Sequence, residues 1–205
     1  GQWIGLDRPA PGDSETQWSR LAARYLRKEF ALTNEVKRAT VHIAGMGLYE
    51  LFINGQRIGE QVLAPAPTDY RKTILYNTYD VTPQLQKENA ISVILGNGRF
   101  YTMRQNYKPY KIPTFGYPKL RLNLIIEYTD GSRQTIASDI SWKLTTEGPI
   151  RSNNEYDGEE YDARKELGDW NRTGYDDTNW IPAGRVSIPS GTLRAQMMPG
   201  MKGTE

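Results

Sequence analysis

The stretch that decides the fold is Leu48-Tyr49-Glu50-Leu51-Phe52-Ile53-Asn54-Gly55-Gln56-Arg57-Ile58. An apolar, β-prone run enters the Asn54-Gly55 pair, and a second short run leaves it. Asn-Gly readily adopts the two positive φ angles of a type I′ turn, the turn that best matches the twist of two antiparallel strands. The stretch therefore predicts a β-hairpin with strands over 48–53 and 56–58.

A second hairpin is predicted downstream, before and after the Asp130-Gly131 turn. Its first strand alternates Leu120, Leu122, Leu124 and Ile126 with Arg121, Asn123, Ile125 and Glu127, and its second is the run 133–136. Further extended segments are expected over 39–43, 73–79, 91–95, 141–144 and 193–197, which gives roughly eight to ten strands. Residues 18–30 fit either one helix face or an alternating strand. Short strands separated by turn residues are typical of an all-β sandwich.

No repeat or low-complexity linker divides the 205 residues, and the proline-rich stretches 65–67 and 109–118 are interpreted as loops. We expect one domain over 1–205, with residues 1–17 allowing an extended arm. A net charge of +2, from 26 basic and 24 acidic residues, argues against nucleic acid as a partner. No apolar run approaches the ~20 residues that cross a bilayer, so no membrane partner is expected.

The chain has no cysteine and a single histidine, His42. Disulfides, thiolate nucleophiles, cysteine-ligated zinc and two-histidine metal motifs are therefore excluded, and a serine triad is hard to build. His42 lies between Val41 and Ile43, so on a strand its side chain faces away from both, toward solvent.

The densest acidic stretch runs from Glu155 to Arg164 and includes Asp157 and Glu160. Such carboxylates could form a glycosidase pair or a calcium loop, but the stretch lacks the spacing of an EF-hand. The favoured interpretation is a surface loop whose acids cap turns and pair with Arg151 or Arg164.

Gly96-Asn97-Gly98 follows a predicted strand and bends the backbone, so that Arg99 and Tyr101 are presented from a loop. The pattern lacks the third glycine and the helix of a nucleotide-binding motif. An aromatic and basic cluster follows: Tyr101, Tyr107, Tyr110, Phe115 and Tyr117, with Arg104, Lys108 and Lys111 between them. Stacking on sugars, docking onto another domain and simple packing all remain open for these rings.

Trp170 and Trp180 flank Asp176-Asp177. Two indoles in a polar segment can form a sugar platform, but the favoured interpretation is that they anchor a long loop on the sandwich.

Several motifs occur together and in order: 44–59, Leu63-Ala64-Pro65, 68–72, 76–82, Leu95-Gly96-Asn97-Gly98, 156–164, Trp170, Asp176-Asp177, Trp180 and 193–196. In these motifs the chain resembles the amino-terminal β-sandwich of bacterial α-L-rhamnosidases of the glycoside hydrolase 78 type, over residues 18–199. The resemblance implies a galactose-binding-like jelly roll. One departure is that Arg99-Phe100-Tyr101 stands where the family usually has Trp-Tyr after the glycine turn.

The resemblance also implies a larger enzyme, in which a later helical domain holds both carboxylates of an inverting rhamnosidase. No catalytic residue is therefore expected in this chain, which we expect to be inactive alone, to pack against the helical domain and to shape the approach to its active site. The candidate carbohydrate-binding or docking residues are Asn97, Arg99, Tyr101, Tyr107, Asp157 and Glu160.

An alternative role is an autonomous binding module for rhamnose-containing glycans of plant or bacterial type. Some sandwiches of the family hold rhamnose with calcium, so calcium is the one cofactor that the resemblance allows, with ligands that the sequence does not identify. A purely structural assembly sandwich is the third class of function. The resemblance implies a periplasmic or secreted location.

Overall fold

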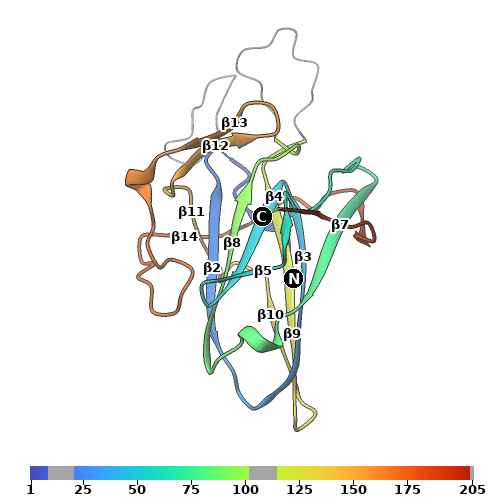
Figure 1. The fold of residues 1–205 in the computed structure, drawn as a ribbon, viewed down its shortest axis with the longest axis vertical. Coiled ribbons are helices and arrows are strands. Elements are labelled where there is room, and N and C mark those ends of the chain that lie inside the picture. Colours follow the sequence, from blue (N-terminus) through green and yellow to red (C-terminus); the bar gives the residue numbers. More distant parts are fainter. Residues whose placement is uncertain (9–20, 102–114, 204–205) are drawn as a thin grey trace.

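A computed structural model describes residues 1–8, 21–101 and 115–203. They form two packed β-sheets whose long strands follow the long axis of the molecule (Figure 1). The larger sheet has the order β15 (Gly184–Arg185), β1 (Ile4–Gly5), β9 (Lys119–Tyr128), β3 (Val36–Met46), β7 (Thr73–Asp80) and β16 (Thr192–Ala195), with β10 (Arg133–Ala137) also beside β9.

The smaller sheet has the order β14 (Ile181–Pro182), β11 (Lys143–Thr145), β2 (Arg24–Ala31), β8 (Glu88–Gly96), β4 (Leu48–Ile53) and β5 (Gln56–Ile58). Two further pairs stand apart, β12 (Ile150–Asn154) with β13 (Gly158–Tyr161) and β6 (Gln61–Val62) with β17 (Met201–Lys202). Two single turns of 3₁₀ helix complete the elements, η1 (Thr82–Gln84) and η2 (Ala163–Lys165). No helix of the described residues is long and apolar enough to cross a membrane.

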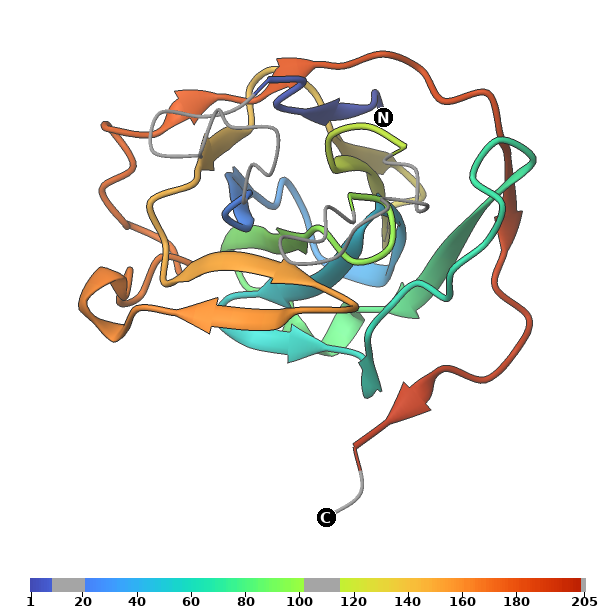
Figure 2. The same cartoon turned by 90° about the horizontal axis from the view of Figure 1, so that it is seen from above.

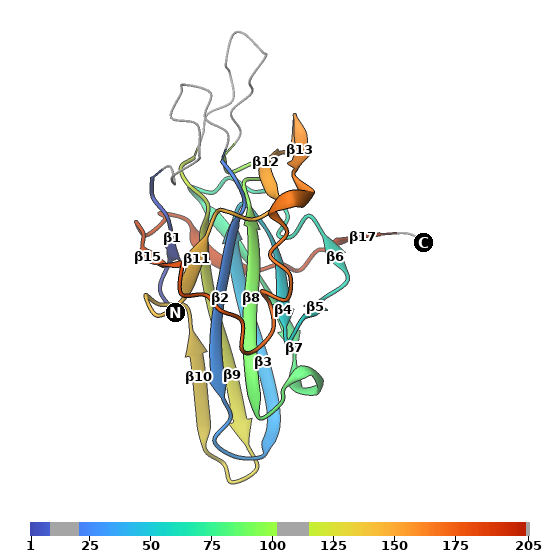
Figure 3. The same ribbon diagram turned by 90° about the vertical axis from the view of Figure 1, so that its left-hand side faces the viewer.

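Both predicted hairpins are confirmed. Asn54 and Gly55 have φ angles of 52° and 81°, as a type I′ turn requires. The Asn54 amide also fixes the turn to the neighbouring strand, because its Oδ1 accepts from the Ala90 N–H at 2.9 Å and its Nδ2 donates to Asn89 Oδ1 at 2.9 Å. The β9–β10 hairpin lies at the opposite end of the molecule from the β12–β13 hairpin (Figure 3).

Period-two alternation places one face of each sheet in the core. On β9, Leu120, Leu122, Leu124 and Ile126 are fully buried and pack against the inward residues of the smaller sheet. Trp142 closes this core with no exposed surface, and its indole N–H donates to the Ala137 carbonyl at 2.9 Å, so its polar atom is satisfied. The all-β sandwich predicted from the sequence is therefore confirmed.

Three details differ from the sequence predictions. Seventeen strands occur in the described residues rather than eight to ten, because short pieces such as β14, β15 and β17 exist only through distant partners. The ambiguous segment becomes a strand from Arg24 onward, since β2 pairs with β8 along its whole length. The acidic surface loop is the β12–β13 hairpin and the turn after it.

The segment after β13 wraps around the outside of the sandwich, passing through β14 and β15 to β16 (Figure 2). On its way it covers the outer face of the smaller sheet. Trp170 and Trp180, each 7% exposed, stack on one another and pack on Tyr25 of β2. The expectation that these two indoles anchor a long loop is confirmed.

Candidate functional site

The predicted site residues that the structure describes lie at the end of the sandwich that carries the β12–β13 hairpin. Arg99 follows the turn after β8 and meets the tip of that hairpin, pairing with the Glu155 carboxylate and donating to the Tyr156 hydroxyl at 2.8 Å. These two hydrogen bonds raise the pKa of Arg99, and the one that Arg99 donates to the Tyr156 hydroxyl contributes most. These contacts hold together two segments that are 56 residues apart. We call Asn97, Arg99, Glu155 and Tyr156 the loop-end cluster.

Asn97 is the buried member of this cluster, at 2% exposed. Its Nδ2 donates to the Leu21 carbonyl at 2.8 Å, and its backbone N–H donates to Asn153 Oδ1 at 2.6 Å. Its Oδ1 is buried and has no hydrogen-bond partner among the described residues. Asn97 therefore connects the loop to β12, and its side-chain oxygen stays without a hydrogen-bond partner among the described residues.

Tyr101 is 6% exposed and stacks on Tyr117 with ring centroids 5.8 Å apart. Phe115 stacks on Phe100 and meets Tyr70 edge to face. Among the open alternatives for these aromatics, the described rings show packing, and Tyr101 does not offer an exposed platform. Tyr107, together with Tyr110, Arg104, Lys108 and Lys111, lies outside the described residues.

Asp157 and Glu160 are exposed on the β12–β13 hairpin. Asp157 Oδ2 accepts from Asn154 Nδ2 at 3.1 Å, and Glu160 Oε2 accepts from Ser152 Oγ at 3.4 Å. Both carboxylates thus engage the opposite strand of their own hairpin. Their role in binding stays a prediction.

The acidic stretch was expected to pair with Arg151 or Arg164, and this is confirmed for Arg164. It hydrogen-bonds Asp162 through Nε and Nη2, each at 2.8 Å, and this contact lowers the pKa of Asp162 to about 2. Arg151, the other arginine named in that expectation, instead donates its guanidinium to the carbonyls of Thr146 and Gly148.

A general acid at neutral pH needs a carboxyl whose pKa is raised by burial or by a neighbouring anion. In the described residues, every carboxyl with a displaced pKa has it lowered, and most are exposed turn residues: Glu60, Asp69, Asp80, Asp130, Asp139, Asp162 and Asp176. In the same part of the chain no three carboxylate, imidazole or thiol groups gather closely enough to hold a metal ion.

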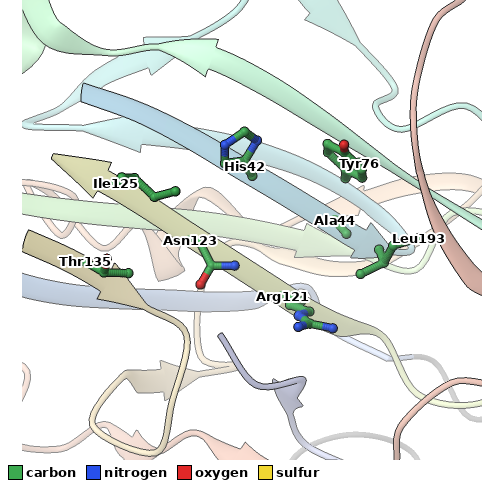
Figure 4. A pocket seen from close by; sticks show the side chains of 8 residues that line it. All are labelled: His42, Ala44, Tyr76, Arg121, Asn123, Ile125, Thr135 and Leu193. Atoms are coloured by element: carbon green, nitrogen blue, oxygen red, sulfur yellow. The ribbon is translucent and has the colours of Figure 1, made fainter. Parts of the chain in front are cut away.

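A second candidate site, which the sequence analysis missed, is a hollow of about 380 Å³ on the outer face of the larger sheet (Figure 4). The strand register builds it, because His42 and Ala44 of β3 lie beside Asn123 and Arg121 of β9. Tyr76 of β7 closes the other side, with its ring 6.0 Å from the imidazole and nearly perpendicular to it. The remaining lining residues are Ile125, Thr135 and Leu193. We call this the sheet-face hollow.

Some polar groups of the sheet-face hollow have hydrogen-bond partners among the described residues, and others have none. Thr78 Oγ1 lies 2.9 Å from His42 Nδ1 and fixes the imidazole, while Asn123 Oδ1 accepts from the terminal amine of Gly1. Arg121, half-buried, has no hydrogen bond or ion pair with any described residue. The signal for this site was the outward set of the β9 alternation, Arg121, Asn123 and Ile125, which the sequence analysis used only to define the strand.

Exposed apolar side chains gather where β6 and β17 pair. Leu63, Met198 and Met201 are 57%, 59% and 58% exposed, and Met197 is 89% exposed. Met201 pairs with Val62, which brings it beside Leu63. We call these four residues the methionine surface; β6 and β17 lie on the side of the molecule from which the C-terminal end projects (Figure 3).

Comparisons with known proteins agree with this architecture. Residues 34–205 match the model of the α-L-rhamnosidase N-terminal domain. An α-L-rhamnosidase of Formosa agariphila is 43% identical over 186 residues, which are 88% of this chain and 19% of that protein. One of Streptomyces avermitilis is 36% identical over 206 residues, or 92% of this chain and 20% of that protein. The chain thus spans about a fifth of the length of these curated relatives.

Solved structures give the same result. The α-L-rhamnosidase from Dictyoglumus thermophilum matches with a TM-score of 0.84 and 40% identity, covering 100% of this chain and 23% of that one. The Streptomyces avermitilis enzyme, solved with L-rhamnose, matches with a TM-score of 0.76 and 36% identity over 84% of this chain and 17% of that one. A Pleurotus ostreatus lectin, at 16% identity and a TM-score of 0.53 over 97% of this chain and 48% of that one, shares the fold alone.

Proposed function

Because the chain belongs to the α-L-rhamnosidase N-terminal domain family, we propose that it is a non-catalytic module that packs against the catalytic part of a rhamnosidase and helps it to recognise substrate. The observation that carries this proposal is the methionine surface. A soluble monomer rarely leaves several large apolar side chains exposed next to one another unless they meet a partner.

The chemistry of the described carboxyls supports the non-catalytic part. The seven carboxyls whose pKa is lowered stay ionised at neutral pH, so these groups do not deliver a proton to a leaving group. We expect the isolated chain to release no product from aryl rhamnosides, and turnover by the pure chain would contradict this.

The docking part is tested with the double variant Leu63→Gln/Met201→Gln, made both in the isolated chain and in a full-length rhamnosidase that contains it. Both side chains are more than half exposed here, so the isolated chain should keep its Tm. In the full-length enzyme the substitutions would remove apolar contacts worth about 1–3 kcal/mol each. We expect a lower Tm, faster release of the module by protease and a reduced kcat/KM on a rhamnoside.

A matched control is Ile140→Gln, which removes a 61% exposed apolar side chain from the turn before β11, away from the methionine surface. It should leave the full-length enzyme unchanged. An equal effect of both variants, or no effect of the double variant on the full-length enzyme, would contradict docking through this surface.

A second candidate function is an autonomous carbohydrate-binding module for rhamnose-containing glycans. The buried, unpartnered Asn97 Oδ1 supports it, because a buried acceptor at the loop-end cluster is stabilised by a donor from a ligand. The match to a relative solved with L-rhamnose adds to the argument. We further propose a periplasmic or secreted location, where such glycans are found.

Calorimetry with L-rhamnose, with and without calcium, tests this role. Since the described residues gather no cluster of metal-binding side chains, calcium enters only as a variable of the titration. Saturable heat that is weakened by Asn97→Ala would support the binding module. The absence of heat in both conditions would remove it and leave the docking role untouched.

A further inference from the structure

The sheet-face hollow lies on a different part of the molecule from the loop-end cluster and the methionine surface. Its lining contains one guanidinium, one imidazole, one amide and one phenol, and no acidic residue. In a fold of near-neutral charge, a concave site lined by cationic and neutral groups alone is suited to an anion.

Arg121 is the central feature of this argument. A guanidinium offers five N–H donors in a planar fork that fits a carboxylate or sulfate. Thirteen ion pairs join other charged side chains of the described residues, and Arg121 takes part in none of them. A half-buried cation without a counterion has lost part of its hydration, and no ion pair or hydrogen bond compensates for that cost.

The surrounding charges do not neutralise Arg121. On the same face of β9, Glu127 is engaged by Arg133 at 2.8 Å. Asp139 is engaged by Lys28 at 3.5 Å. A further positive charge is the Gly1 amine, whose pKa is lowered by burial and then by Arg121, against an opposing contribution from Asp139. Among the residues that the structure describes, the positive charge of the hollow is therefore uncompensated.

The other lining groups fit a sugar ring rather than a bare anion. The Tyr76 ring, with Ala44 and Leu193 beside it, gives an apolar wall against which the C–H face of a pyranose can lie. The Asn123 Nδ2 and the second ring nitrogen of His42 have no partner among the described residues and can bond hydroxyl groups. The small Ala44, between Arg121 and Tyr76, creates the space (Figure 4).

We propose that the sheet-face hollow is a subsite for an anionic saccharide residue, a sugar that carries a carboxylate or a sulfate ester bound by Arg121 and lies against Tyr76. The inference rests on the membership of the chain in a glycan-cleaving family but not on docking through the methionine surface. In a rhamnosidase, such a subsite would select glycans in which acidic sugars accompany the one that is cleaved.

The test is a titration of the 205-residue chain with the methyl glycoside of D-glucuronic acid, followed by calorimetry and by backbone amide shifts. We expect saturable binding with shifts on β3, β7 and β9 around the hollow. Arg121→Gln should raise the Kd at least tenfold, because a charge-assisted pair is lost. Arg121→Lys should give an intermediate Kd, since it keeps the charge but loses the fork.

A matched control is Arg194→Gln, which removes the same charge from an exposed neighbour of Leu193 that does not line the hollow. It should leave the Kd unchanged. Tyr76→Ala should weaken the glycoside more than it weakens inorganic sulfate, which makes no ring contact. Glucose 6-sulfate in a parallel titration distinguishes a sulfate ester from a carboxylate as the preferred group.

Several outcomes would overturn the inference. They are no saturable binding of either acidic sugar, an equal Kd for Arg121→Gln, an inorganic anion that binds as tightly as the sugar, or binding of an acidic peptide without binding of the sugar. The docking test uses other residues and the full-length enzyme, so either proposal can fail while the other holds.

Discussion

The outer faces of the two sheets carry two arginines in opposite situations. Arg27, on the smaller sheet, is 1% exposed and lies under the segment that wraps around the sandwich, where its guanidinium meets Asp177, Glu29 and the carbonyls of Trp170 and Arg172, both at 2.9 Å. Arg121, on the larger sheet, lies in an open hollow with no partner among the described residues. The chain closes one face with its own residues and leaves the other to a ligand.

On the closed face, Arg27 holds the wrapping segment against the smaller sheet. The guanidinium of Arg27 also lies 5.4 Å from the Tyr175 ring, and the Trp170 and Trp180 indoles stack beside it. The wrapping segment has little regular structure of its own, and this one side chain supplies hydrogen bonds to two of its carbonyls, those of Trp170 and Arg172. No described segment lies over Arg121 on the open face, and its donors have no partner in this part of the chain.

The largest effect should come from breaking the closed face. Arg27→Met should destabilise the chain by about 3–5 kcal/mol, because it leaves buried carbonyls and the Asp177 carboxylate without their cation. Urea unfolding measures the loss. The control is Arg133→Met on the open face, whose 70% exposed side chain makes one ion pair and should cost less than about 1 kcal/mol. Similar losses of unfolding free energy for the two variants would show that Arg27 contributes no more than an exposed arginine of the open face.

A smaller effect is expected where the β4–β5 turn meets the wrapping segment. Gly55 donates its N–H to the Asn171 carbonyl at 3.0 Å and has a φ of +81°, so Gly55→Ala should cost about 1–2 kcal/mol through backbone strain. A Cβ there would also come within 3.0 Å of the Arg172 side chain.

The matched control is Gly131→Ala in the β9–β10 turn, with a φ of +84° and open space around the added Cβ. It carries the same backbone strain without the contact. The difference between the two losses of unfolding free energy measures the contribution of the contact with Arg172. A smaller loss for Gly55→Ala than for Gly131→Ala would show that the wrapping segment is not held at the β4–β5 turn.

The smallest effect is expected on the open face. Arg121→Met should change the free energy of unfolding by no more than about 0.5 kcal/mol, because it breaks no contact with a described residue. Urea unfolding beside Arg27→Met provides the measurement. A loss as large as that of Arg27→Met would mean that Arg121 is structural, and the contrast between the two faces would fail.

The sequence predicted what depends on local patterns. The Asn54-Gly55 turn, the β9 alternation and the sandwich class follow from neighbouring residues, and the two anchoring tryptophans were recognised by their setting in a polar segment. The two-residue strands could not be predicted, since periodicity has no meaning over two residues and their partners lie far away in the chain.

The sites were harder to predict for the same physical reason. Arg99 and Glu155 were each singled out as parts of motifs, but only the fold brings the two loops together. The burial of Tyr101 depends on Tyr117, whose ring stacks on it. The sheet-face hollow needs the register of β3, β7 and β9 at once, and no single stretch of sequence carries that information.

The strands that end each of the two sheet orders are short. They are β15 and β16 in the larger sheet and β14 and β5 in the smaller one, each of two to four residues, and β14 contains Pro182. Long, regular edges invite strands of other molecules to add to them, and short or proline-bearing edges discourage this. These four ends of the sheets therefore discourage edge-to-edge pairing, whereas β10, with five residues paired only to β9, forms a longer edge. Short ends are a useful property for a module that belongs to a family of chains about five times its length.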